Sequence, residues 1–173
     1  MQSPEYPPSS GTERELLENQ IEFARAMVIY KATGISKEDG IKRLGPTATS
    51  VLGVLRHLTE VEHWWFQDRF AGIPYTESRS SEEDPDGEFT ILEGDTVESL
   101  IEGYKAACEN SRQIAKGRSL DDLAAHARTT DNAHPNLRWV YLRIIDETAR
   151  HSGNMEIYRE LLDNFHGGRI TSK

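Results

Sequence analysis

An acid and an imidazole stand one helical turn apart near the end of the chain. In the segment "IIDETARHSGNMEIY", Glu147 precedes His151 by four residues, so a helix would carry both side chains on the same side. His151 also lies in a series of mostly apolar residues spaced four and three apart, which predicts a core position. An ionised carboxylate is costly to bury alone, so Glu147 needs a partner there. A divalent metal is one suitable partner, and a buried arginine is another.

A third candidate ligand, His57, lies on a second apolar stripe, three residues after Val54 and four before Val61. Helical bundles commonly build metal sites from carboxylate and imidazole side chains on facing helices. Three protein ligands leave at least one coordination position open, which is typical of a catalytic zinc site. We therefore predict that His57, Glu147 and His151 hold a metal. Hydrogen-bonded core histidines and a chance Glu-x-x-x-His pair would explain the same pattern without one.

Helical periodicity dominates the chain and predicts an all-α fold. Four long amphipathic helices in 173 residues imply a four-helix bundle. We expect these helices over about 12–33, 48–70, 94–117 and 137–164. The first begins with a capping box at Thr12 and Glu15, and the third begins with the acidic residues Asp95 and Glu98. Stops are expected at Gly34 for the first helix and at Gly167–Gly168 for the last. The stripes predicted to face the core are Leu17, Ile21, Ala24 and Val28; Val54, His57, Leu58, Val61 and Trp65; Val97, Ile101, Tyr104, Cys108 and Ser111; and Leu137, Tyr141, Ile144, Thr148, His151, Met155, Tyr158 and Leu162.

Composition limits the partners and the location of the protein. The net charge of −9 disfavours nucleic acid and anionic membrane surfaces as partners, because both would repel the chain. The first residues lack the basic region and apolar core of a signal peptide, and Cys108 is the single cysteine. We therefore expect a cytoplasmic protein without an internal disulfide. Residues 1–11 are predicted to be a disordered lead-in, and residues 12–168 a single domain.

The acidic segment between Ala71 and Asp95 is unusually long for a loop inside a compact domain. A lid over the site is one interpretation, but the composition favours a mobile, solvated loop. Phe89, Ile91 and Leu92 could attach one end of it to the bundle.

Other reactive or aromatic residues have simpler structural explanations. Cys108 is better explained as a small buried residue than as a nucleophile. The tryptophans Trp64, Trp65 and Trp139 could line a substrate pocket, although core or dimer contacts are favoured. Surface ion pairing is the favoured role of Arg56, Arg143 and Arg150, which could otherwise attract an anionic thiol. His63, His126 and His134 are expected on the surface or in loops.

Two segments, "VLGVLRHLTEVEHWWF" and "LRWVYLRIIDETARHSGNMEIYRELLD", resemble the DinB-like superfamily. The resemblance is greatest to an actinobacterial branch of unknown function near the mycothiol-dependent maleylpyruvate isomerases, and it extends from about Glu13 to Gly168. It implies a four-helix bundle, often a homodimer, that carries a divalent metal. One ligand would be a histidine of the second helix and two would be spaced four apart on the last helix, which here are His57, Glu147 and His151.

The resemblance also implies a chemistry. The metal would be zinc, with nickel or iron as alternatives, and the co-substrate a low-molecular-weight thiol such as mycothiol. The metal would lower the pKa of the thiol, and the thiolate would attack an electrophile. We therefore predict a metal-dependent thiol S-transferase or isomerase that serves detoxification. The alternatives are a non-catalytic metal-binding stress-response protein, an iron oxygenase with a facial triad, and a purely structural bundle.

The chain departs from its relatives at two points. Many relatives read "RHNGH" where this chain has "RHSGN", so Asn154 stands in place of an imidazole and would change the hydrogen bonds around the ligands. The maleylpyruvate isomerases also carry an additional C-terminal domain that helps to build their site. The sequence ends at Lys173 without it, so the resemblance does not imply isomerisation of maleylpyruvate.

Overall fold

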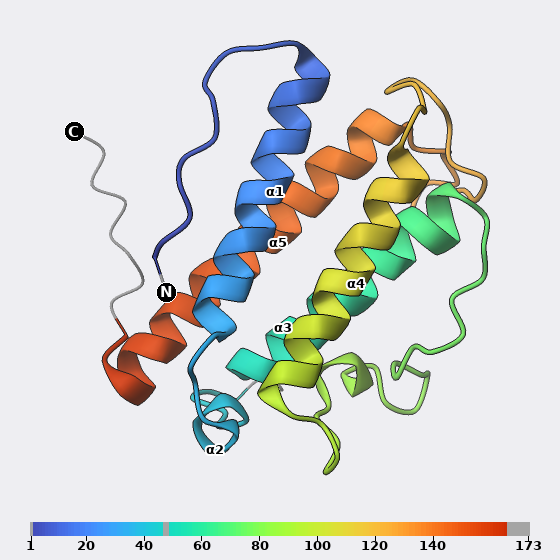
Figure 1. The fold of residues 1–173 in the computed structure, drawn as a ribbon. Helices are drawn as coiled ribbons and strands as arrows, with labels where there is room; N and C mark the ends of the chain where they lie inside the picture. Colours follow the sequence, from blue (N-terminus) through green and yellow to red (C-terminus); the bar gives the residue numbers. More distant parts are fainter. Residues whose placement is uncertain (1, 47–48, 166–173) are drawn as a thin grey trace.

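The computed structural model describes residues 2–46 and 49–165, and its regular structure is helical throughout these ranges. Four long helical segments form the bundle: α1 (Glu13–Ala32), α3 (Val51–Glu62) with its continuation η1 (His63–Phe70), α4 (Val97–Ala115) and α5 (Leu137–Asp163). Two short helices, α2 (Lys37–Gly40) and the 3-10 turn η2 (Gly87–Phe89), lie in the connections. The predicted all-α four-helix bundle is confirmed (Figure 1).

The helix ends follow local capping chemistry. Thr12 and Glu15 form the predicted capping box of α1, and Gly34 follows that helix with a φ of 78°. The α4 helix begins two residues later than Asp95, because Thr96 caps it together with Ser99. At the other end of the chain, α5 ends at Asn164, which adopts the left-handed conformation with a φ of 55°. The stop predicted at 167–168 lies outside the described residues.

The second long helix differs from the prediction of one uninterrupted α-helix over 48–70. Its predicted start at Ala48 lies outside the described residues, and the α-helical part ends at Glu62. Residues 63–70 continue as a π-helix, in which Ala71 N donates to the carbonyl of Phe66. The wider turn buries Phe66 and Phe70 and leaves Trp64 40% exposed. Hydrophobic spacing does not distinguish the two hydrogen-bonding patterns over so few residues, and π-helical turns are frequent at functional sites.

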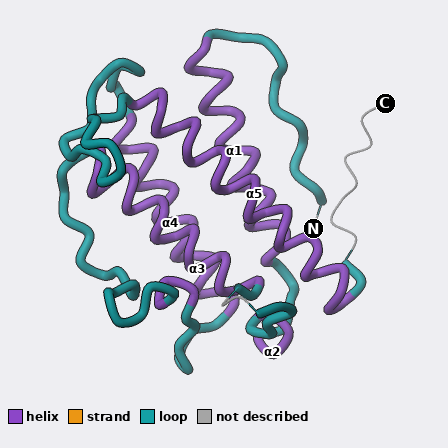
Figure 2. The backbone as a smooth tube through the Cα atoms, turned by 180° about the vertical axis from the view of Figure 1, so that it is seen from behind, coloured by secondary structure: helices purple, strands orange, loops and turns teal. Residues whose placement is uncertain are grey.

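The long helices form two neighbouring pairs, with α1 against α5 and α3 against α4 (Figures 1 and 2). The predicted stripe residues are buried, apart from half-buried Leu17, Trp65, Tyr158 and Leu162. In Figure 1, α3 and α4 both run upward, so the chain must return along the outside of the bundle between them. This parallel arrangement explains why the segment 71–96 is long, since helix pairs of this kind require a crossover connection. No helix within the described ranges is both long enough and apolar enough to span a membrane.

The crossover segment is attached to α3 by buried polar groups. Glu60, which is 4% exposed, accepts hydrogen bonds from Ser78 Oγ at 2.7 Å and from Arg79 N at 3.0 Å. Arg79 in turn donates to the carbonyl of Thr90 at 2.7 Å. A Cβ atom on Gly87 would lie 2.0 Å from the carbonyl oxygen of Arg79, so the turn at η2 requires glycine. These contacts place η2 against α3 and beside His57, while most of the remaining residues of the segment are exposed, as expected of a solvated loop.

Candidate metal centre

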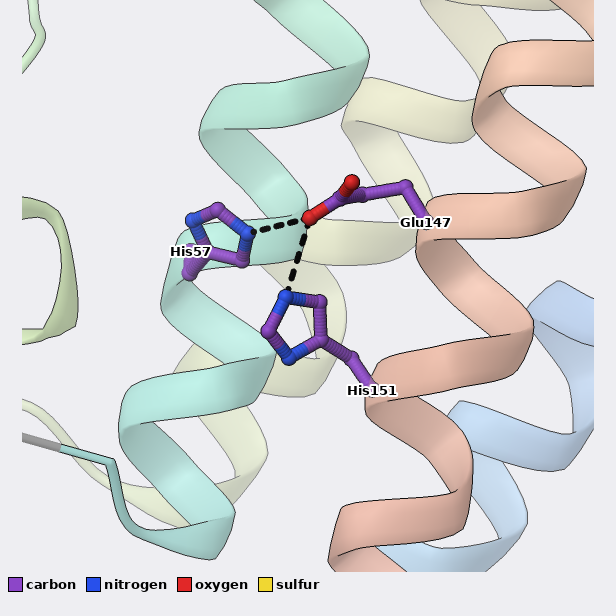
Figure 3. Close-up of side chains that lie close together, drawn as sticks. All are labelled: His57, Glu147 and His151. Carbon is purple, nitrogen blue, oxygen red and sulfur yellow. Dashed lines mark hydrogen bonds and ion pairs between the residues drawn. The ribbon is translucent and has the colours of Figure 1, made fainter. Parts of the chain in front are cut away.

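The three predicted ligands meet between α3 and α5 (Figure 3). His57 comes from α3, and Glu147 and His151 come from successive turns of α5. Glu147 Oε1 lies 3.3 Å from His57 Nε2 and 2.9 Å from His151 Nε2. All three side chains are buried, with exposed fractions of 8% for His57, 4% for Glu147 and 6% for His151. Residues that are 90 positions apart in the chain therefore present nitrogen and oxygen atoms to one point.

The donor atoms fit a divalent metal. They all lie within 4.8 Å of one another. In a tetrahedral zinc site, ligand atoms about 2.1 Å from the metal are about 3.4 Å apart, close to the separations seen here. Two imidazoles and one carboxylate suit zinc, and also iron or nickel. The set could hold such an ion and would leave a coordination position for a small molecule.

The crossover segment adds a fourth polar group to the centre. Glu88 Oε2, on η2, lies 3.0 Å from His57 Nδ1, the nitrogen that faces away from Glu147. A carboxylate at this place favours the proton on Nδ1 and leaves the lone pair of Nε2 free for a metal, as in many carboxylate–histidine–metal arrangements. Phe89 stacks on the His57 ring with 4.5 Å between centroids. Both contacts fix the orientation of His57.

The sequence alone did not predict the contacts of Glu88 and Phe89 with His57. Phe89 was expected to attach the segment to the bundle, which the structure confirms, but not to stack on a ligand. Glu88 is one of several acidic residues in its segment, and its role depends on the turn at Gly87. Asn154, the residue that departs from the relatives, is half-buried and its side chain makes no hydrogen bond within the described ranges.

Two arginines also pair with the central carboxylate. Arg150 Nη2 donates to Glu147 Oε1 at 2.6 Å, and Arg143 Nη2 pairs with Glu147 Oε2. The side chains of Arg150 and Arg143 are 53% and 34% exposed, so they lie on the solvent side of the buried carboxylate. Arg56 pairs with Glu60 at 2.7 Å. All three arginines form ion pairs, as expected, but Arg56 does so in the interior rather than on the surface, since it is 8% exposed. Glu147 has arginine partners as well as the imidazoles.

The neighbours keep the central carboxylate ionised. Burial alone raises the pKa of Glu147, but hydrogen bonds from His151, His57 and Arg150 outweigh it and hold that pKa well below its usual range. Burial lowers the pKa of His57, whereas its contacts with the carboxylates of Glu147 and Glu88 raise it. The contacts outweigh burial, so the pKa of His57 lies above that of an ordinary histidine. A metal must therefore compete with a proton on His57, because only the neutral imidazole is a ligand.

The remaining candidates lie away from the centre. Cys108 is 1% exposed, and burial raises the pKa of its thiol far above the usual range, so it is a buried structural residue as predicted. His63 bonds to Gln67 at 3.0 Å and stacks on Tyr75. His126 and His134 lie in the connection before α5.

Removing the second carboxylate should weaken metal binding without abolishing it. We expect Glu88→Ala to lower zinc affinity by about 10–100-fold, because His57 loses the group that fixes its tautomer. Competition with a chromogenic chelator measures the affinity. Glu82→Ala is the matched control, since Glu82 is an exposed residue of the same segment. Equal zinc affinities for the two variants would contradict a supporting role of Glu88.

Comparison with known proteins gives the chain a family. No curated protein and no solved structure matches it. The family model described as mycothiol-S-transferase matches residues 16–164, a range that contains all four long helices except the first turn of α1, and all three converging side chains. This range agrees with the resemblance seen in the two segments around His57 and His151. The chain belongs to the mycothiol-S-transferase family.

Proposed function

We propose that the protein is a metal-dependent transferase that joins mycothiol to an electrophile. The observation that supports this most strongly is the convergence of His57 Nε2, His151 Nε2 and a Glu147 oxygen in a chain of this family. We further propose zinc as the metal and a cytoplasmic homodimer as the working form.

Each residue of the centre has a separate task in this proposal. His57, Glu147 and His151 hold the metal, and Glu88 holds the proton on His57 Nδ1 so that Nε2 remains a ligand. Phe89 covers one face of His57 and limits the access of water to it. The bound metal would supply Lewis acidity, which lowers the pKa of a thiol and makes thiolate available at neutral pH.

The proposed transfer is a substitution at carbon. The sulfur of the thiol uses a lone pair to form an S–C bond, and the leaving group departs with the electron pair of the bond that breaks. The thiol proton passes to water, so that thiol and alkyl chloride give thioether, chloride and a proton. Arg150, which pairs with Glu147 and is 53% exposed, would offer positive charge to a departing anion.

A thiol panel tests the function. Zinc-loaded protein is incubated with monochlorobimane and either mycothiol, bacillithiol or glutathione, and the fluorescent thioether is followed. We expect conjugation with mycothiol above the uncatalysed rate, and a loss of at least about 100-fold in His57→Ala. The control variant is His63→Ala, which removes a histidine of the same helical segment that lies outside the centre. An uncatalysed rate with all three thiols would contradict transferase activity and favour a non-catalytic metal-binding protein.

A further inference from the structure

All three tryptophans of the chain line a cavity of about 270 Å³, and one further wall residue, Arg143, pairs with Glu147 of the candidate metal centre. Trp64 and Trp65 come from η1, and Trp139 comes from the first turn of α5. Trp65 and Trp139 meet edge to face with 5.1 Å between their centroids. Such a volume is near the lower limit of ligand pockets and suits a molecule of about one ring. Aromatic walls of this kind bind flat, apolar bodies.

The same cavity carries three guanidinium groups. Arg69 lies over the Trp64 ring at 4.1 Å and Arg128 over the Trp139 ring at 4.7 Å, while Arg143 completes the wall. Their acidic partners include Asp131 and Asp146, whose side chains are 44% and 69% exposed. Exposed ion pairs contribute little stability, so an incoming carboxylate can replace the contacts with Asp131 and Asp146 at low cost. The contacts of Arg69 with Asp68 and of Arg143 with Glu147 involve less exposed carboxylates.

Arg143 connects this cavity to the metal centre. Trp139, Arg143 and Glu147 follow one another at intervals of four residues along α5, about 6 Å per step. Arg143 lines the cavity and also pairs with Glu147 Oε2. A metal held by Glu147 would compete for that carboxylate and free donors of Arg143 for another anion. Arg143 is therefore the residue through which this cavity contacts the candidate metal centre.

We propose that this cavity seats the electrophilic substrate, and that the substrate is an aromatic or conjugated carboxylic acid. The tryptophans hold its flat body, and Arg143 binds its carboxylate beside the metal centre. The carbon attacked by the thiolate is then one close to the carboxylate, and it must carry the leaving group, which departs with the electron pair of its bond to that carbon as the S–C bond forms. This inference rests on the proposed transferase function and names the class of its second substrate.

Binding of benzoate, with benzamide as its uncharged counterpart, tests the proposal. The three tryptophans provide the signal, since selectively excited tryptophan fluorescence reports on the cavity. In zinc-loaded protein we expect benzoate to bind more tightly than benzamide. Arg143→Gln should raise the Kd of benzoate at least about tenfold, because a charge-assisted hydrogen bond is lost, and should leave benzamide unchanged. The matched control is Arg150→Gln, which removes the other arginine of Glu147 but not a wall of the cavity.

The alternatives give different results. A Kd for benzoate that is equal in Arg143→Gln and Arg150→Gln overturns the proposal, and so does benzoate binding no tighter than benzamide. A fluorescence change with mycothiol that depends on Arg143, with none for benzoate, also overturns it. Metal-stripped protein should still bind benzoate, more weakly and in a way that depends on Arg143. If binding instead requires zinc and does not depend on Arg143, benzoate binds the metal and the assignment is contradicted. None of these titrations requires thiol transfer, so failure of the proposed function is detected separately by the thiol panel.

Discussion

Glu147→Gln is expected to reduce zinc affinity by more than about 100-fold, because groups around a ligand alone are worth 10–100-fold and Glu147 is proposed as a ligand itself. The glutamine keeps the size and one oxygen of the side chain but removes the charge that faces His57 and His151. Zinc content after purification without added metal and chelator competition both measure the loss.

The neighbouring residue provides a close control for this variant. Asp146→Asn makes the same change of charge one position earlier, at a side chain that is 69% exposed and pairs with Arg143. We expect its zinc affinity to stay within about threefold of the wild type, because exposed charges at this distance are well screened. An equal loss in both variants would show that the net charge, rather than ligation by Glu147, determines zinc binding.

The same pair of variants separates the metal site from the arginine explanation. If Arg143 and Arg150 are the only partners that Glu147 needs, the wild type binds no zinc, and Glu147→Gln lowers only the free energy of unfolding. If the carboxylate is a ligand, zinc should raise the unfolding midpoint of the wild type, since a ligand that binds only the folded state stabilises it. It should not raise the midpoint of Glu147→Gln.

The candidate site could be predicted from the sequence only in part. The four-residue spacing of Glu147 and His151 fixes their common side on any helix, so it follows from local geometry alone. The approach of His57 depends on how α3 packs against α5. Its place on an apolar stripe suggested it as the third ligand, and the family resemblance supported that choice. Glu88 depends on a turn that is held by Glu60 on another helix and by the absence of a side chain at Gly87. Such contacts of irregular segments leave no periodic signal.

The fold was predictable where side-chain burial determines it. Apolar stripes predicted the four long helices, because burial requires one face of each helix to be apolar. The π-helix at 63–70 differs from an α-helix in its backbone hydrogen bonds. The spacing of apolar residues in the sequence is compatible with either, so the stripe could not reveal it. The π-helix nevertheless places Trp64 and Trp65 on the wall of the cavity that contacts the candidate metal centre through Arg143.

On the opposite side of α3 from this centre, a second acidic residue is expected to be essential for stability. Glu62 is 1% exposed and binds the 3% exposed guanidinium of Arg25 through two hydrogen bonds of 2.8 and 2.6 Å. Burial alone lowers the pKa of Arg25, but the charge of Glu62 outweighs it and raises that pKa well above the usual value. The arginine therefore stays charged and depends on the carboxylate.

Glu62→Gln should lower the free energy of unfolding by about 3–5 kcal/mol, because it leaves a buried guanidinium without its main counter-charge. Urea unfolding measures the change. Glu22→Gln is the control, since Glu22 also contacts Arg25, at 2.7 Å, but its side chain is 41% exposed and its loss should cost about 1 kcal/mol or less.

Replacing both partners, as in Arg25→Met with Glu62→Leu, should recover most of the loss, because two apolar side chains leave no charge to compensate. A cost for Glu62→Gln no larger than that for Glu22→Gln would mean that water or Glu22 stabilises Arg25 as well as Glu62 does. A large cost, with zinc affinity unchanged, would establish that these two buried acidic residues serve separate purposes: Glu62 for the fold and Glu147 for the metal.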